Sequence, residues 1–144
     1  MGAVRFYIEF RPSFDGPASL EITAVERNDA RVYLKGNQNY DVGSEAEQVI
    51  WVQYSDVAGL LERVPRYLHE AKHDKVRMGL DGITVCGVFE PSEGEATDFK
   101  FWSPRERDAG QRLVADVFAF VKTLTVQANV SRSFRGLRRY FHED

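Results

Sequence analysis

An alternation of apolar and polar residues near the N-terminus constrains the fold of this chain more than any other feature. In the first alternating segment every second residue is apolar: Val4, Phe6, Ile8 and Phe10. Successive side chains of a β-strand point to opposite faces of a sheet, so this segment predicts a strand with one face on a core and the other in water. The same period of two returns in residues 19–24 and 31–35, with a tight turn at Asn28 and Asp29 between them. We therefore expect three consecutive antiparallel strands.

The next segment predicts a fourth strand followed by a helix. Residues 48–54 are apolar on both faces, which suits a central strand or a strand that turns one face to a partner. Between Ser55 and His73 the apolar residues recur at spacings of three and four, as on one side of an amphipathic helix. These positions are Val57, Leu60, Leu61, Val64, Leu68 and Ala71. Ser55 or Asp56 is expected to cap the helix, and Pro65 to bend or restart it because proline removes a backbone hydrogen bond.

Two more strands and a second helix complete the pattern. Residues 83–89 and 98–102 predict the arms of a hairpin that are joined by an acidic turn. Ser103 is then expected to cap the second helix, with Pro104 at its first position and Glu106 completing a capping box. The apolar face of that helix is wide enough to be the main cover of a sheet.

These patterns predict a single α+β domain, because neither half of the chain has a full core by itself. The expected architecture is an antiparallel sheet of about six strands covered by two helices, in the order ββββ-α-ββ-α. The domain is expected to span residues 1–130, and residues 131–144 to form a basic tail that is docked on it or partly disordered. Phe134, Leu137 and Phe141 recur at a helical spacing that suits docking.

The distribution of charge bears on the class of partner. The net charge is −3, and residues 131–144 carry four arginines and two carboxylates, a sum of +2, so residues 1–130 sum to −5. An acidic body argues against nucleic acid, whose phosphates favour a basic surface. The tail alone interleaves cations with aromatic residues, as single-strand binders do. We therefore expect a protein partner.

Several features predict a protein of the cytoplasm. Cys86 is the only cysteine, so no intrachain disulfide can form, and it falls in a strand pattern where an inert buried thiol is expected. The N-terminal segment reads directly as a strand and shows no secretory signal. The longest apolar region, residues 114–121, is interrupted by Asp116 and is too short to span a bilayer. No association with a membrane is expected.

The string His69-Glu70-Ala71-Lys72-His73 matches H-E-x-x-H, in which two histidines of one helix bind zinc and the glutamate activates a water. At about 100° per residue, these histidines fall about 120° and 160° from Val57, on the polar side of the first helix. No spacing selects a third ligand from the available carboxylates, which are Glu90, Glu93, Glu95 and Glu106. We interpret the string as a surface feature and expect no metal or other cofactor. A zinc-dependent hydrolase that uses His69, Glu70 and His73 is the alternative hypothesis.

No catalytic motif of another kind is present: the sequence has no Gly-rich phosphate loop, no C-x-x-C pair and no G-x-S-x-G elbow. Acidic residues gather at the turn between the fifth and sixth strands, which predicts either a solvated turn or a negative surface for a basic partner. Trp51 and Trp102 are expected in the core as strand residues, although tryptophan is also a favoured interface anchor. The candidate partner-binding residues are Glu90, Glu93, Glu95, Asp98 and Trp102.

Three features follow one another in the second half of the chain: the turn Leu80-Asp81-Gly82-Ile83-Thr84, the aromatic strand Phe99-Lys100-Phe101-Trp102-Ser103-Pro104, and the long helix after it. Together they resemble a pattern of small bacterial proteins, some of which accompany secreted antibacterial toxins as immunity proteins. The resemblance implies a non-enzymatic protein that neutralises a toxin by binding a toxin domain with a basic site. A structural or adaptor subunit, which forms a homo-oligomer or larger assembly through residues 48–54, is the third hypothesis.

Overall fold

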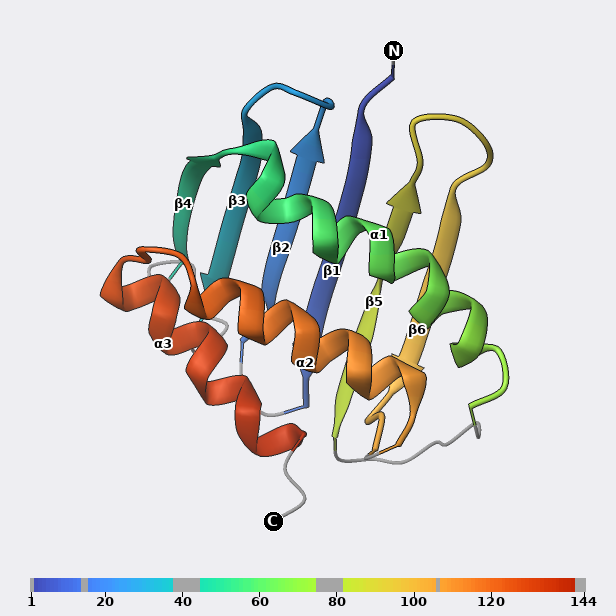
Figure 1. Cartoon of the computed structure of the whole chain (residues 1–144). Helices are drawn as coiled ribbons and strands as arrows, with labels where there is room; N and C mark the ends of the chain where they lie inside the picture. Colours follow the sequence, from blue (N-terminus) through green and yellow to red (C-terminus); the bar gives the residue numbers. More distant parts are fainter. Residues whose placement is uncertain (1, 14–15, 38–44, 75–81, 106, 142–144) are drawn as a thin grey trace.

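The computed structural model describes residues 2–13, 16–37, 45–74, 82–105 and 107–141. Within these residues, six strands form one antiparallel sheet in the order β4-β3-β2-β1-β5-β6 (Figure 1). The strands are β1 (Val4–Pro12), β2 (Ala18–Ala24), β3 (Ala30–Asn37), β4 (Glu45–Val52), β5 (Ile83–Glu90) and β6 (Thr97–Trp102). The predicted α+β class is confirmed, as is the order of four strands, a helix, two strands and a helix.

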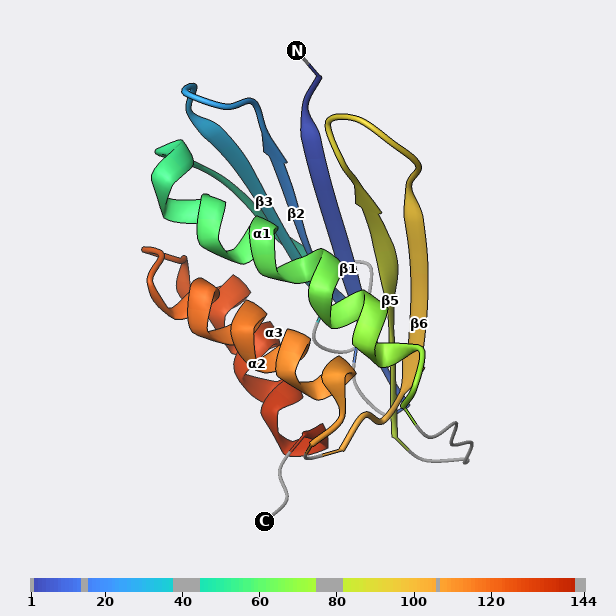
Figure 2. The same cartoon turned by 45° about the vertical axis from the view of Figure 1, so that its right-hand side comes forward.

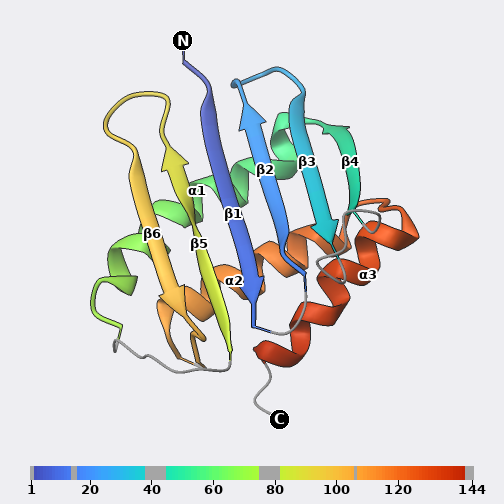
Figure 3. The ribbon, with the colours of Figure 1, turned by 180° about the vertical axis from the view of Figure 1, so that it is seen from behind.

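The described helices lie on one face of the sheet and leave the other face uncovered (Figure 1, Figure 2). They are α1 (Tyr54–Ala71), α2 (Ala109–Lys122) and α3 (Ala128–Leu137), and a short 3-10 helix, η2 (Arg138–Tyr140), follows α3. None of these helices is both long and apolar enough to cross a membrane. Seen from behind, the strands lie in front of all three helices (Figure 3).

The core lies between the sheet and the helices and follows the alternation in the sequence. Phe6, Ile8 and Phe10 of β1 have no exposed surface, and β1 lies in the middle of the sheet between β2 and β5. Burying one such side chain contributes about 1.5–3 kcal/mol relative to leaving it in water. The alternate residues of β1 therefore point to the uncovered face, as the one-sided strand pattern predicts.

The first helix buries the predicted apolar stripe. Its buried residues are Val57, Leu60, Leu61, Val64 and Leu68. The cap lies earlier than predicted, because the helix begins at Tyr54 and Gln53 is its N-cap residue. Asp56 closes a capping box by accepting a hydrogen bond from the backbone N–H of Gln53 at 3.0 Å. Pro65 causes no restart, since α1 continues through it to Ala71.

The predicted start of the second helix is wrong. α2 begins at Ala109, with Asp108 as its N-cap residue. The Oγ of Ser103 instead accepts a hydrogen bond from the backbone N–H of Ile83 at 3.0 Å, and the φ angle of Ser103 is 41°. Ser103 therefore ties the end of β6 to the start of β5 and does not cap a helix. Glu106, the expected partner in a capping box, lies outside the described residues.

An acidic residue beyond the end of α1 caps α2. The carboxylate of Asp74 accepts hydrogen bonds from the backbone N–H groups of Ala109 and Gly110, both at 3.1 Å. These amides belong to the first turn of α2, which has no partner for them within the helix. The negative charge also suits the positive end of the helix dipole. The loop after α1 thus fixes where α2 begins.

The strand β4 lies at the edge of the sheet. It begins at Glu45, before the predicted residue 48, and the option of a central position is wrong. The side chain of Gln48 donates from Nε2 to the carbonyl of Thr125 at 3.3 Å and accepts at Oε1 from the N–H of Gln127 at 2.8 Å. These two hydrogen bonds hold β4 to the connection between α2 and α3.

The region predicted as a basic tail contains most of α3. Val130, Phe134 and Leu137 of α3 are buried, so this helix completes the cover of the sheet. The ring of Phe134 meets the ring of Phe10 edge-on, with centroids 6.3 Å apart. α3 also approaches β3 closely, because a Cβ atom at Gly36 would collide with the side chain of Ser133. The buried residues of this region, Phe134, Leu137 and Phe141, therefore belong to the same core as the sheet.

Candidate interaction surface

Figure 3 shows the strands from the uncovered face of the sheet. Cross-strand pairing arranges the side chains of this face in rows. One row runs from Trp51 of β4 through Arg31, Thr23 and Arg5 to Glu90 of β5, each residue directly opposite the next. Neighbouring strands are about 4.8 Å apart, so the row spans about 19 Å. A partner that lies across the strands near this end would contact side chains from five strands.

Trp51 and Val49 are the exposed large hydrophobic residues that the structure describes. The exposed fraction is 62% for Trp51 and 43% for Val49. They are two residues apart in β4 and therefore share the uncovered face, where Val49 lies opposite Tyr33. The expectation that Trp51 lies in the core is wrong because the other face of this edge strand, with Ile50, already packs on the core. The signal in the sequence was the apolar character of residues 48–54 on both faces.

Ion pairs connect the charged side chains in the middle of the row. The Nε of Arg5 donates to Glu21 at 2.7 Å, and its Nη1 lies 3.4 Å from a carboxylate oxygen of Glu90. Arg31 lies 3.8 Å from the other carboxylate oxygen of Glu21. Pairs that are this exposed contribute at most about 1 kcal/mol each. Their main effect is to hold long side chains flat against the sheet, where a partner could meet them in an ordered arrangement.

Tyr7 and Cys86, at the centre of the face, are held in their neutral forms. Burial, and after it the negative charge of Glu9, raises the pKa of Tyr7 to about 12. The hydroxyl of Tyr7 donates to Glu9 at 3.0 Å, and Arg11 donates to the same carboxylate at 2.9 Å. Burial also raises the pKa of Cys86, which is half-buried. At neutral pH this phenol and this thiol are therefore hydrogen-bond donors and not activated nucleophiles.

Among the strand side chains that the structure describes, the charges of the uncovered face balance. The cations are Arg5, Arg11, Arg31, Lys35 and Lys100, and the carboxylates are Glu9, Glu21, Glu47, Glu90 and Asp98. A surface that binds nucleic acid needs an excess of cations to neutralise phosphates. Five charges of each sign suit the mixed surface of a protein better.

Four of the five predicted partner-binding residues gather at the turn between β5 and β6. This cluster, called the acidic turn below, consists of Glu90, Glu93, Glu95 and Asp98. Trp102 is half-buried at the opposite end of β6, where it pairs with Thr84. Four residues at about 3.3 Å each place it about 13 Å along the strand from Asp98. The structure therefore brings the acidic residues together and separates Trp102 from them.

The acidic turn and Trp51 lie at the same end of the uncovered face. Glu90 and Trp51 are the first and last residues of one cross-strand row. The β5–β6 connection also lies at the same end of the sheet as the end of β4 that leads into α1 (Figure 3). Within the described residues, Glu93, Glu95 and Asp98 have no cationic partner. This end of the face thus combines an exposed aromatic side chain with unpaired negative charge.

The two histidines of the H-E-x-x-H string are exposed neighbours at the end of α1. Their ring centroids are 6.4 Å apart, and His73 lies in the turn after the helix. A carboxylate oxygen of Glu70 lies 3.6 Å from Arg112 of α2. Among the described residues, no group of three histidines, cysteines or carboxylates could hold a metal ion. The structure thus brings together two of the ligands that a zinc hydrolase requires and gathers no described third one with them.

Two comparisons with known proteins identify no relative of this chain. A scan against models of protein families finds no match. A search of curated proteins finds no match either. The functional argument therefore rests on the surface itself.

Proposed function

We propose that this chain is a non-enzymatic binding protein of the immunity type, which neutralises a bacterial toxin by contact through the uncovered face of its sheet. The observation that carries the proposal is Trp51, an exposed tryptophan at the end of the face that also holds the acidic turn. Aromatic side chains are over-represented among the residues that contribute most to binding free energy. A tryptophan left in water by an edge strand is a suitable anchor for a partner.

Charge supports a partner with a basic site. The unpaired carboxylates of the acidic turn would attract such a site and orient it toward Trp51. Cations of the toxin would then meet Glu93 and Glu95, while its apolar surface would cover Trp51 and Val49. The balanced charges of the row between the acidic turn and Trp51 would accept a mixed polar surface. A toxin that acts inside a bacterial cell places the protein in the cytoplasm, as the sequence predicts.

The size of the face indicates how the partner would lie. Five spacings of about 4.8 Å give the sheet a width of about 24 Å. A standard protein interface buries about 800 Å² on each partner. A complex with this face must therefore use most of its width, and Trp51 alone would not hold a toxin.

Protection from toxicity tests this proposal in cells. Each protein encoded beside this chain is expressed in a bacterial host, alone and together with the chain, and growth is measured. We expect one neighbour to stop growth and the wild-type chain to restore it. Trp51→Ala, and separately Glu93→Lys with Glu95→Lys, should lose protection. Glu62→Lys, an exposed charge reversal on α1, is the matched control and should protect fully.

Two outcomes contradict the proposal. One is that no neighbouring protein is toxic or that the wild-type chain does not relieve toxicity. The other is that the Trp51 and acidic-turn variants protect as well as wild type while remaining folded. Circular dichroism of each purified variant separates loss of binding from loss of folding.

A structural subunit is the second candidate, and the edge position of β4 favours it. An edge strand can pair with the same strand of another copy, and exposed apolar residues such as Val49 and Trp51 strengthen that tendency. Light scattering of the purified protein decides this question. A stable dimer that dissociates in Trp51→Ala supports the subunit, and a monomer at high concentration excludes self-pairing through β4.

A further inference from the structure

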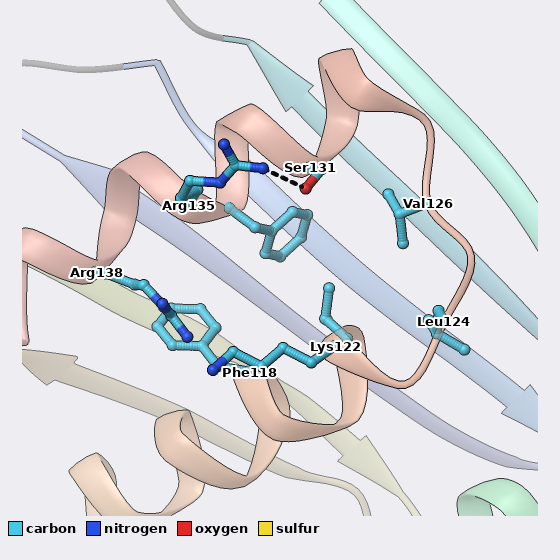
Figure 4. A pocket seen from close by; sticks show the side chains of 9 residues that line it. Phe118, Lys122, Leu124, Val126, Ser131, Arg135 and Arg138 are labelled. Atoms are coloured by element: carbon cyan, nitrogen blue, oxygen red, sulfur yellow. Dashed lines mark hydrogen bonds between the residues drawn. The ribbon is translucent and has the colours of Figure 1, made fainter.

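A groove with a cationic rim runs between α2 and the region of α3 and η2 (Figure 4). It consists of two adjoining cavities of about 330 Å³ and about 400 Å³. Phe118, Lys122 and Arg138 line both cavities and join them into one concave surface. Volumes in this range are typical of sites for small molecules. The groove belongs to the helix layer and is separate from the uncovered face of the sheet.

The floor of the groove is apolar and rigidly supported. The ring of Phe118 stacks on Phe10 with centroids 5.4 Å apart and meets Phe141 edge-on at 5.6 Å. One cavity follows α2 from Gln111 to Lys122, which is about 16 Å along a helix at about 1.5 Å per residue. The apolar floor is therefore elongated along α2, a shape that suits an extended hydrocarbon chain.

Among the residues that the structure describes, the rim carries positive charge without a matching carboxylate. Lys122, Arg135 and Arg138 are exposed, and no described acidic residue lines either cavity. Arg135 donates to the hydroxyl of Ser131 at 3.4 Å, and within the described residues none of the three cations forms an ion pair. Figure 4 shows Lys122 and Arg138 reaching toward one another across Phe118. Two like charges above an apolar floor favour an anion between them.

We propose that this groove binds a small amphipathic carboxylate of the fatty-acid type. The hydrocarbon chain lies on the apolar floor along α2, and the carboxylate lies between Lys122 and Arg138. The competing occupant, an acidic amphipathic helix of another protein, fits less well because the two cavities have the volume of a small-molecule site. Both cations lie at helix C-termini, whose negative dipole ends offset part of their charge, so moderate affinity is expected.

Titration of the intact protein with three simple probes tests this proposal. Decanoate supplies the tail and the negative head, decyltrimethylammonium the same tail with a positive head, and acetate the head alone. We expect saturable binding of decanoate below its micelle concentration, with amide NMR shifts centred on Phe118, Ala119 and Lys122. The other two probes should bind at least about tenfold more weakly, since each lacks one of the two interactions.

Variants locate the site. Lys122→Glu with Arg138→Glu should weaken decanoate binding by about tenfold or more. Ala119→Phe should block it by filling the groove from an exposed position of α2. Arg132→Glu makes one such charge reversal on an exposed position of α3 that lines neither cavity, and it should bind as wild type does. Melting curves establish that each variant is folded.

Four results overturn the proposal. They are equal binding of decyltrimethylammonium, shifts outside the groove, unchanged decanoate binding in both groove variants, and no saturable binding of decanoate. A synthetic acidic amphipathic peptide is titrated in parallel. If the peptide shifts the amide NMR signals of the groove and decanoate does not, the groove is assigned to a protein partner instead.

Discussion

Arg31 of β3 lies directly opposite Trp51 of β4, and its guanidinium also lies over the ring of Tyr33 at 5.3 Å from the centroid. Trp51 therefore stands beside an ordered cation on a sheet face that no described helix covers. At this position Trp51 can contact a partner without packing in the core. The two roles can be separated by experiment.

Replacing Trp51 should change stability little. Trp51→Ala removes a side chain that is already 62% exposed, so the free energy of unfolding should change by less than about 1 kcal/mol. Leu34→Ala, in the neighbouring strand and fully buried, should cost about 2–5 kcal/mol. Urea denaturation of both variants measures the difference. Equal losses of stability would mean that Trp51 supports the core.

A methyl group at Gly36 should push α3 away from the sheet. Gly36→Ala places a Cβ atom against the side chain of Ser133, and overpacking of this kind costs about 1–3 kcal/mol. Ser133→Gly in the same chain should recover most of the loss. The matched control is Gly136→Ala on α3, where nothing lies within 4 Å of the new methyl group. The control should stabilise the protein slightly, because alanine favours a helix more than glycine does.

Asp116 should make stability depend on acid pH. Burial tends to raise the pKa of Asp116, but hydrogen bonds from Arg63 and Tyr67, together with the charge of Arg63, outweigh it and lower the pKa below 3.8. The carboxylate accepts from Arg63 at 2.6 and 2.9 Å and from Tyr67 at 2.9 Å, joining α1 to α2. Because the pKa is lower in the folded state, the ionised carboxylate stabilises the fold at pH values above the pKa of the unfolded state. This contribution is lost as the pH falls through the pKa of the folded state.

Asp116→Asn tests that contribution. We expect a loss of about 1–3 kcal/mol at pH 7, because the variant replaces charge-assisted hydrogen bonds with weaker ones, and a smaller loss near pH 3. Tyr67→Phe removes one hydrogen bond and keeps the ion pair, so it should cost about 0.5–1.5 kcal/mol. Urea denaturation at the two pH values measures both. The same loss for Asp116→Asn at pH 7 and pH 3 would rule out this linkage.

Zinc should not be a component of the purified protein. His69 and His73 are exposed at the end of α1, so His69→Ala should leave the melting temperature unchanged with and without added zinc. Elemental analysis of protein purified without chelators measures the metal directly. One zinc per chain that is lost in His69→Ala would instead support the hydrolase hypothesis.

The sequence predicts those strands and helices that bury one face. Prediction from the sequence fails where contacts with residues distant in the chain determine the structure. Phe6, Ile8 and Phe10 specify a one-sided strand because their period is local, and the stripe of α1 is local in the same way. Ser103 and Pro104 resemble a helix start, but the hydroxyl of Ser103 is taken by Ile83 of the neighbouring strand. The hydrogen bond between Ile83 and Ser103 therefore overrides the local capping pattern.

The start of α2 and the exposure of Trp51 depend on the assembled fold. Asp74 caps Ala109 and Gly110 from a sequence distance of 35 and 36 residues, which no local motif indicates. The exposure of Trp51 follows from the edge position of β4, and strand order is not encoded in the alternation of a single strand. The acidic turn was predictable as a cluster because its four residues are close in sequence. Its proximity to the end of the sheet that carries Trp51 was not.

The dissociation constant for the cognate toxin, measured by calorimetry with wild type, Trp51→Ala and the Glu62→Lys control, tests the central claim most directly. We predict that Trp51→Ala weakens binding at least about 30-fold, the loss expected for an interface anchor worth about 2 kcal/mol, and that Glu62→Lys binds as wild type does. A folded Trp51→Ala variant that binds the toxin within about twofold of wild type would contradict the assignment of the uncovered sheet face as the binding surface.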